Sequence, residues 1–223
     1  MRPRRPIGIP GNKLLIGLLG TLVAIVVPAI ILPTLVCRKD AYDLPDLGTV
    51  PPFSLVDDQH QTFTEAALRG HPTIVDFVFT RCDSICPMLS ARMAKLQEKL
   101  SDTRAESIKL LSISVDPQHD TPDVLAAYAH RFGAHPDKWR FLTGPREDIV
   151  RLVTGPFMGL MRPEGVSPGG APAITHSPFF LLVDANLTVR GVYDSRDLPK
   201  VEQMMRHARY LARTGGATYK FGN

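Results

Sequence analysis

The 223-residue chain is poor in cysteine, and this scarcity excludes two classes of protein. It has only Cys37, Cys82 and Cys86, too few for a disulfide-rich scaffold or for a structural zinc site built from two cysteine pairs. A domain of this size also buries enough apolar surface without covalent cross-links. We therefore expect the close pair Cys82 and Cys86 to perform chemistry, with a purely structural disulfide as the alternative.

Basic clusters interleaved with aromatic residues, which are typical of nucleic-acid-binding surfaces, are also missing. The chain has 26 Lys and Arg against 22 Asp and Glu, but four of the basic residues lie within the first 13 positions. Without those four, the two signs balance at 22 each. We expect no nucleic-acid partner.

Motifs of two enzyme classes are absent as well. The segment VDFVFT before Cys82 lacks the Pro-x-x-x-Thr-x-x-Cys arrangement expected of peroxiredoxins. The sequence offers no convincing Ser/His/Asp grouping for a hydrolase. The chemistry of the chain is therefore expected to centre on its cysteines.

Charged side chains are absent from residues 14–36, LLIGLLGTLVAIVVPAIILPTLV. As a helix this run would be ~35 Å long, which is enough to span a hydrocarbon core of ~30 Å. Basic residues and no acid precede it, and positive flanks stay in the cytoplasm. We expect a single-pass anchor in the bacterial inner membrane, with the N-terminus cytoplasmic and the C-terminal domain periplasmic.

Alternatives exist for this segment. A cleaved signal peptide has an apolar core of only ~7–15 residues before a small-x-small cleavage site, which PTLVC matches poorly. Cys37 resembles a lipoprotein cysteine, but Val36 is larger than such signals prefer, and we favour a thiol at the membrane edge. A mitochondrial setting is disfavoured because the leader lacks a long Arg/Ser-rich amphipathic segment.

Strand-like and helix-like segments alternate through the rest of the chain, which is typical of a sheet covered by helices on both faces. A β-α-β unit followed by a β-β-α unit predicts an α/β, thioredoxin-like fold, and an N-terminal β-hairpin at 51–64 extends it. The expected organisation is a basic cytoplasmic leader (1–13), a transmembrane anchor (14–36), a linker (37–50), the thioredoxin-like domain (51–213) and a flexible tail (214–223).

Periodicity places the elements of this domain. Residues 72–80, PTIVDFVFT, form a nearly continuous apolar run that predicts a buried central strand. Residues 87–100 have helical spacing, and Thr121 is the expected N-cap of a second helix. Further strands are predicted at 108–115, 139–144, 178–184 and 188–194, and further helices at 145–155 and 198–214.

Cys82 and Cys86 lie where the predicted central strand gives way to a helix. Free N–H groups and the helix dipole favour a thiolate at such a place. If one helical turn separates the two residues, both sulfurs face the same way and can bind one metal ion or form a disulfide. Three intervening residues, one more than in the thioredoxin redox motif, suit a metal better.

Two thiolates with one or two imidazoles would suit copper in either oxidation state. Among the seven histidines, His176 directly precedes the strand predicted at 178–184. In a thioredoxin-like sheet that strand neighbours the one leading to Cys82, so His176 is a candidate ligand. Its position fits a capping residue at the start of a strand equally well.

The segments TRCDSICP, SISVDPQHDTP and THSPFFLLVD, in this order behind one anchor, resemble the Sco/SenC family over about residues 45–213. The eight-residue separation of His176 and Asp184 fits the family pattern. The resemblance implies that Cys82 and Cys86 are thiolate ligands of copper, as Cu(I) or Cu(II), and that His176 is the imidazole ligand. It also implies that Asp116 of the SVDP segment lies near the site.

Members of that family are membrane-anchored copper proteins that help assemble the binuclear copper site of cytochrome c oxidase. The resemblance thus implies a metallochaperone and leaves open whether the chain is an enzyme, namely a thiol–disulfide reductase. Transfer of a metal between proteins needs a shallow, exposed site, which we expect from a site built by loops at a sheet edge. Its expected partners are the oxidase subunit carrying the binuclear copper site, a copper donor protein or thiol reductant, and the membrane through the N-terminal helix.

Two other functions stay open. A thiol–disulfide oxidoreductase that reduces the cysteines of an oxidase subunit would need Cys82 and Cys86 as a disulfide-forming pair, but not His176. A copper or redox sensor would instead use its metal state to control contact with a partner.

Overall fold

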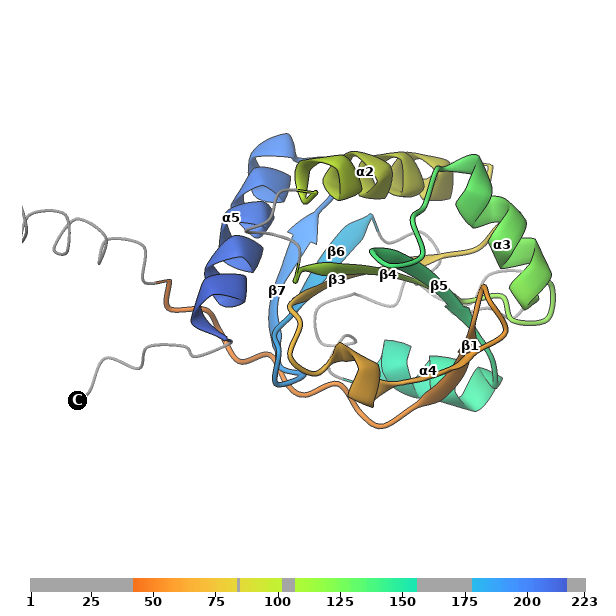
Figure 1. Cartoon of the computed structure of the whole chain (residues 1–223). Helices are drawn as coiled ribbons and strands as arrows, with labels where there is room; N and C mark the ends of the chain where they lie inside the picture. The colour runs from red at the N-terminus through yellow and green to blue at the C-terminus, as the bar shows by residue number, and fades with distance from the viewer. Residues whose placement is uncertain (1–41, 84, 102–106, 156–177, 216–223) are drawn as a thin grey trace, which may run out of the picture. The chain divides into compact units, whose positions relative to one another are not determined.

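The computed structural model describes residues 42–83, 85–101, 107–155 and 178–215 (Figure 1). The chain divides into two compact units, Met1–Ala41 and Tyr42–Asn223, and every described residue belongs to the second. Within those described ranges no helix is long and apolar enough to cross a membrane. The anchor predicted at 14–36 lies outside them.

A seven-stranded sheet with the order β2-β1-β5-β4-β3-β6-β7 forms the centre of the second unit. The strand predicted at 72–80 is β3, and all of its residues are buried, as its continuous apolar pattern predicted. The strands are β1 (Ser54–Asp57), β2 (Thr62–Thr64), β3 (Thr73–Val78), β4 (Lys109–Ser114), β5 (Trp139–Thr143), β6 (Phe179–Val183) and β7 (Val189–Asp194).

Helices cover both faces of this sheet, which confirms the predicted layering (Figure 1). Side chains alternate along β3, so Ile74 and Val78 join the apolar cluster of one face while Val75 and Phe77 join that of the other. The first face carries α2 (Ile85–Lys99), α3 (Pro122–Arg131) and α5 (Leu198–Thr214), and the second carries α4 (Arg146–Thr154) and the 3-10 helix η2 (Glu65–Leu68).

Strand pairing decides which loops meet. β3 and β4 are parallel, with Val78 opposite Ser114. β6 is antiparallel to β3, with Leu181 opposite Val75. The C-terminal ends of β3 and β4 therefore share one edge of the sheet with the start of β6.

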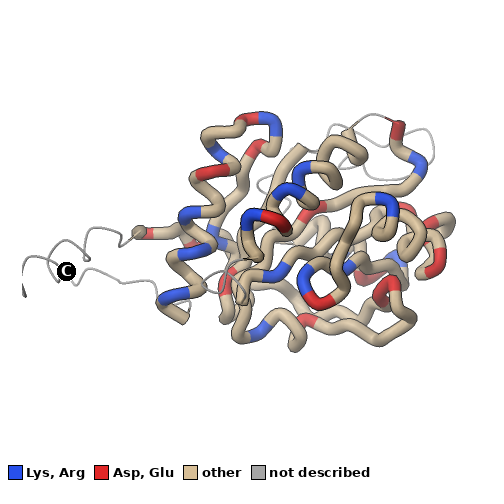
Figure 2. The backbone as a smooth tube through the Cα atoms, turned by 45° about the horizontal axis from the view of Figure 1, so that its top comes forward, with Lys and Arg blue, Asp and Glu red and all other residues tan. Residues whose placement is uncertain are grey.

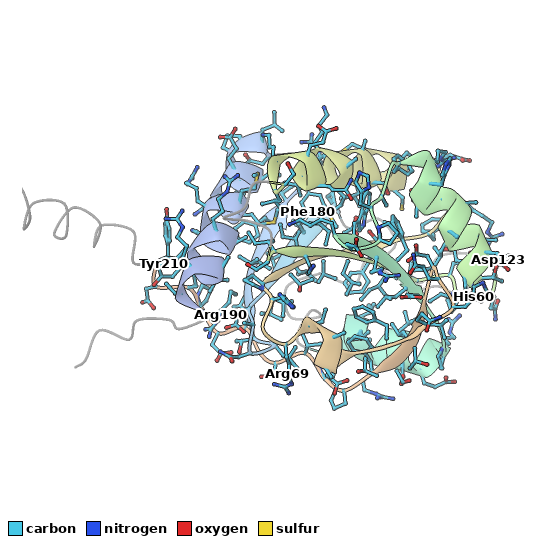
Figure 3. All side chains as sticks on the ribbon, in the orientation of Figure 1. His60, Arg69, Asp123, Phe180, Arg190 and Tyr210 are labelled. Atoms are coloured by element: carbon cyan, nitrogen blue, oxygen red, sulfur yellow. The ribbon has the colours of Figure 1, made fainter. Side chains whose placement is uncertain are left out.

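The predicted N-terminal hairpin is present. β1 pairs antiparallel with β2 and, on its other side, with β5, so the hairpin widens the sheet. Its turn contains His60, whose backbone is left-handed with a φ of 61° and whose Nε2 lies 2.9 Å from a carboxylate oxygen of Asp123 on α3 (Figure 3). The hairpin is thereby tied to the helix beside it.

Acidic and basic residues are interspersed along the described backbone (Figure 2). One ion pair stands apart because it is buried, namely Asp184 with Arg190 at 2.7 Å. The other oxygen of Asp184 accepts the N–H groups of Asn186 and Thr188, and Arg190 also donates to the carbonyl of Pro45 at 3.4 Å. Asp184 therefore shapes the β6–β7 turn, at the opposite end of β6 from the cysteine edge.

Replacing Arg190 by Ala should leave the Asp184 carboxylate buried without its counter-ion. We expect a loss of about 3–5 kcal/mol in the free energy of unfolding, because an unpaired buried charge is strongly destabilising. Urea denaturation followed by circular dichroism measures it. The matched control is Arg196→Ala, which breaks the exposed pair with Asp194 and should cost far less. Equal losses in the two variants would contradict this assignment.

Candidate metal centre

Both cysteines are carried by the connection from β3 to α2. Residues 79–82 form a turn in which the N–H of Cys82 donates to the carbonyl of Phe79 at 3.2 Å. Helix α2 begins at Ile85, so Cys82 precedes the helix and Cys86 lies in its first turn. The predicted placement of the pair at the junction of strand and helix is confirmed.

The two residues are in direct contact. The backbone N–H of Cys86 donates to Sγ of Cys82 at 3.4 Å. Neither cysteine forms a disulfide in this structure. An N–H group at the start of a helix stabilises negative charge on the sulfur that it meets. This contact therefore suits Cys82 to act as a thiolate.

The sulfur pair is buried, so the expectation of a shallow, exposed site was wrong for the thiols. Cys82 is 6% exposed and Cys86 is fully buried. The reason is that the first turn of α2 packs onto the sheet, so both cysteines join the apolar cluster that contains Leu89 and Val78. In this arrangement the two cysteines present little surface to a ligand or a partner protein.

Burial also opposes the ionisation expected from the helix dipole. It raises the pKa of the Cys86 thiol and outweighs the lowering by a hydrogen bond with the backbone of Phe79, while the nearby Cys82 and Asp76 raise the pKa further by smaller amounts. Desolvation outweighs the dipole here because Cys86 is enclosed by apolar side chains. A bound cation would reverse this balance, since a coordinating thiol is deprotonated by the metal charge.

Sequence reasoning missed a buried acid beside the pair. Asp76 of β3 is fully buried on the α2 face of the sheet. Its Oδ1 accepts a hydrogen bond from Ser112 at 2.6 Å, and Trp139 in turn donates to Ser112 at 2.9 Å. Burial raises the pKa of Asp76 to about 7. The available signal was a single acid in the middle of the apolar run PTIVDFVFT.

Asp116 stands on the outer side of the same edge. Arg81, the residue before Cys82, donates to its Oδ2 at 2.6 Å, and Nδ1 of His119 lies 2.9 Å from Oδ1. Partial burial raises the pKa of Asp116, but hydrogen bonds from His119 and Arg81 outweigh this and leave it below its usual range. Asp116 thus contacts the cysteine loop through Arg81, and its predicted role as a group near the metal that is not itself a ligand stays a prediction.

His176 and Cys37 lie outside the described residues. Across the part of the chain that the structure covers, no three His, Cys, Asp or Glu side chains come together to hold a metal. The first described residue after the gap is Pro178, which is buried and whose carbonyl accepts the N–H of Ser195 at 2.7 Å. The chain therefore enters β6 at the edge that carries the cysteines, while the ligand set of Cys82, Cys86 and His176 stays a prediction.

A family model described as SCO1/SenC matches residues 44–212. The SCO1 protein homolog of Bacillus subtilis (strain 168) is 33% identical over 137 residues, which cover 60% of this chain and 67% of that protein. The chain thus spans about two thirds of the length of this curated relative.

Two solved structures have the same fold. One is BsSco, described as a member of the Sco family of cytochrome c oxidase assembly proteins with a disulfide switch. It is 26% identical, with a TM-score of 0.59, over 75% of this chain and 97% of that one. The other is ScoI of Arabidopsis thaliana with copper bound, 26% identical with a TM-score of 0.60, over 75% of this chain and 99% of that one.

The buried acid generates a pH-dependent stability for the metal-free, reduced protein. The pKa of Asp76 rises from 3.8 to about 7 on folding, so its contribution is most favourable below pH 3.8 and is lost as the pH rises through about 7. Asp76→Asn removes this ionisation. Relative to the variant, the wild type should lose about 4 kcal/mol of unfolding free energy between pH 4 and pH 8. Urea denaturation at both values tests this, and a difference that does not change with pH would contradict it.

Proposed function

The chain belongs to the SCO1/SenC family, and from this premise we propose that it binds copper and delivers it to the cytochrome c oxidase subunit that carries the binuclear copper site. Two relatives support the proposal, one solved with copper bound and one described as an oxidase assembly protein. The observation that carries it is the contact of two cysteines that form no disulfide, with the N–H of Cys86 3.4 Å from Sγ of Cys82. A copper donor protein or a thiol reductant would act before this step.

We assign the copper ligands to Cys82, Cys86 and His176. Two sulfurs and an imidazole form a donor set suited to copper in either oxidation state. The antiparallel pairing of β6 with β3 supports the third assignment, because β6 begins beside the end of β3 and His176 precedes Phe179, its first residue, by only three positions in the sequence. When bound, copper supplies the positive charge that lets the buried Cys86 ionise, so loading should release thiol protons.

Metal counting on the reduced, full-length chain in detergent tests this assignment. After anaerobic incubation with Cu(I) or Cu(II) and gel filtration, the wild type should retain roughly one copper per chain. In competition with a chelator, copper affinity should fall at least about tenfold in each of His176→Ala, Cys82→Ser and Cys86→Ser. Replacing even a residue that only hydrogen-bonds to a metal ligand typically lowers metal affinity by about 10–100-fold, so loss of a ligand should have at least this effect.

The matched control is His130→Ala, which removes an exposed imidazole on α3 and should bind copper as the wild type does. Failure of the wild type to retain copper would reject the proposed function. If His176→Ala binds as tightly as His130→Ala does, the assignment of the third ligand is wrong.

A second function is favoured by the same contact of two reduced cysteines, namely reduction of a disulfide in an oxidase subunit. It needs Cys82 and Cys86 to cycle between thiols and a disulfide and does not need His176. A disulfide-containing peptide from the copper-binding subunit separates the two functions. Each reduction of the peptide disulfide leaves Cys82 and Cys86 as a disulfide, so the assay includes a thiol reductant that returns them to thiols. As a reductase, the His176→Ala variant would turn over the peptide at the wild-type rate, whereas a copper carrier would show negligible turnover above the reductant alone.

We also propose that residues 14–36 anchor the domain on the periplasmic face of the bacterial inner membrane. The uncharged run and the basic leader before it support this topology. Protease treatment of intact spheroplasts should remove a C-terminal epitope tag and spare an N-terminal one. The reverse pattern would rule the topology out.

A further inference from the structure

Asp120 is a fully buried carboxylate at the sheet edge that carries the cysteines. Both of its oxygens are used. The hydroxyl of Thr80 donates to Oδ1 at 2.5 Å, and Oδ2 accepts the N–H of Thr80 at 3.1 Å and the hydroxyl of Ser114 at 2.5 Å. Burying a carboxylate is costly unless such bonds compensate for the lost water. The three hydrogen bonds therefore offset the cost of burying this carboxylate.

Two of the three donors belong to Thr80, which lies two residues before Cys82. Thr80 is the second residue of the 79–82 turn that ends with the N–H of Cys82 donating to the carbonyl of Phe79. Fixing both the N–H and the hydroxyl of Thr80 fixes the orientation of that turn. The direction in which the Cys82 side chain leaves the backbone follows from it.

Asp120 is itself firmly held from the opposite side. Its N–H donates to the carbonyl of Asp116 at 2.9 Å, and the next residue, Thr121, caps α3 by accepting the N–H of Val124. The start of a packed helix thus serves as the fixed point to which the cysteine turn is attached. These hydrogen bonds join residues that are 40 positions apart in the sequence, Thr80 and Asp120.

Asp116 holds the same turn from its outer side, through the side chain of Arg81. That contact is half exposed, since the Arg81 side chain is 58% accessible to solvent. Solvent-exposed ion pairs of this kind contribute little to the stability of the folded state. The buried link from Asp120 to Thr80 is the one able to fix the backbone.

We propose that Asp120 is a positioning residue for Cys82: through Thr80 it fixes the turn that brings Sγ of Cys82 against the N–H of Cys86. The consequence for copper rests on the proposed function, whereas the consequence for the thiol pair does not. Loosening the turn should change both the affinity for copper and the equilibrium between the two thiols and their disulfide.

The test compares Asp120→Asn, Thr80→Val and Thr80→Ser in the full-length chain. Equilibration with glutathione buffers gives the equilibrium constant of the Cys82–Cys86 disulfide, and chelator competition gives the Cu(I) affinity. Asp120→Asn and Thr80→Val should each shift the disulfide constant by at least tenfold, about 30 mV, and weaken Cu(I) binding by a similar factor. Thr80→Ser keeps the hydroxyl donor and should restore wild-type values.

The matched control is Asp184→Asn, which alters another fully buried, hydrogen-bonded carboxylate at the far end of β6. It should lower the unfolding free energy and leave the disulfide constant within about twofold of wild type. If Asp184→Asn shifts the disulfide constant as much as Thr80→Val does, the effect of Asp120 would be a general loss of stability and not the positioning of Cys82. This result would overturn the proposal.

If Asp120→Asn does not fold, Thr80→Val provides the test. This substitution removes one hydroxyl and leaves the Asp120 carboxylate and the other hydrogen bonds to it in place. Wild-type values of the disulfide constant in Thr80→Val would overturn the positioning role. If the wild type binds no copper, the proposed function fails, and the shift in the disulfide constant still confirms or rejects the role of Asp120.

Discussion

The parallel pairing of β3 with β4 is the constraint on which the rest of this edge depends. Its register places Val78 beside Ser114, so the loops that follow the two strands leave the sheet side by side. One loop carries the cysteines and the other carries Asp120, and only this pairing brings them together across 40 residues of sequence. Because β6 runs antiparallel to β3, β6 begins at the same edge.

Burial and charge oppose each other at this edge. The cysteines and Asp76 are enclosed by apolar side chains, which raises the pKa of Cys86 and of Asp76. Metal-free protein therefore keeps Cys86 as a neutral thiol. At the proposed copper site, a bound metal cation would compensate for the negative charge that burial disfavours and would allow Cys86 to ionise.

The sequence was sufficient to predict most of the elements. The apolar run of β3, the helical spacing of α2 and the cap at Thr121 are local signals, and the structure has each of them where expected. The cysteine pair was recognisable because its spacing carries chemistry. His176 was placed by resemblance and by its position before β6, and it lies outside the described residues.

The missed features depend on tertiary contacts. Nothing local distinguishes Asp120 from Asp116 within SVDPQHD, yet one is buried against Thr80 and the other faces Arg81 near solvent. The enclosure of the sulfurs arises from the packing of α2 on the sheet, which no cysteine spacing reveals. For Asp184 the sequence pattern was visible but its role was not. Its separation from His176 fits the family pattern, yet in the structure its carboxylate accepts a hydrogen bond from Thr188 within the β6–β7 turn.

X-ray absorption spectroscopy of the Cu(I)-loaded, full-length chain tests the central claim most directly, because it identifies the donor atoms. Two sulfur scatterers and one imidazole nitrogen are expected around the metal in the wild type, and the imidazole signal should vanish in His176→Ala. A shell without sulfur, or an imidazole signal that survives this substitution, would contradict a centre formed by Cys82, Cys86 and His176.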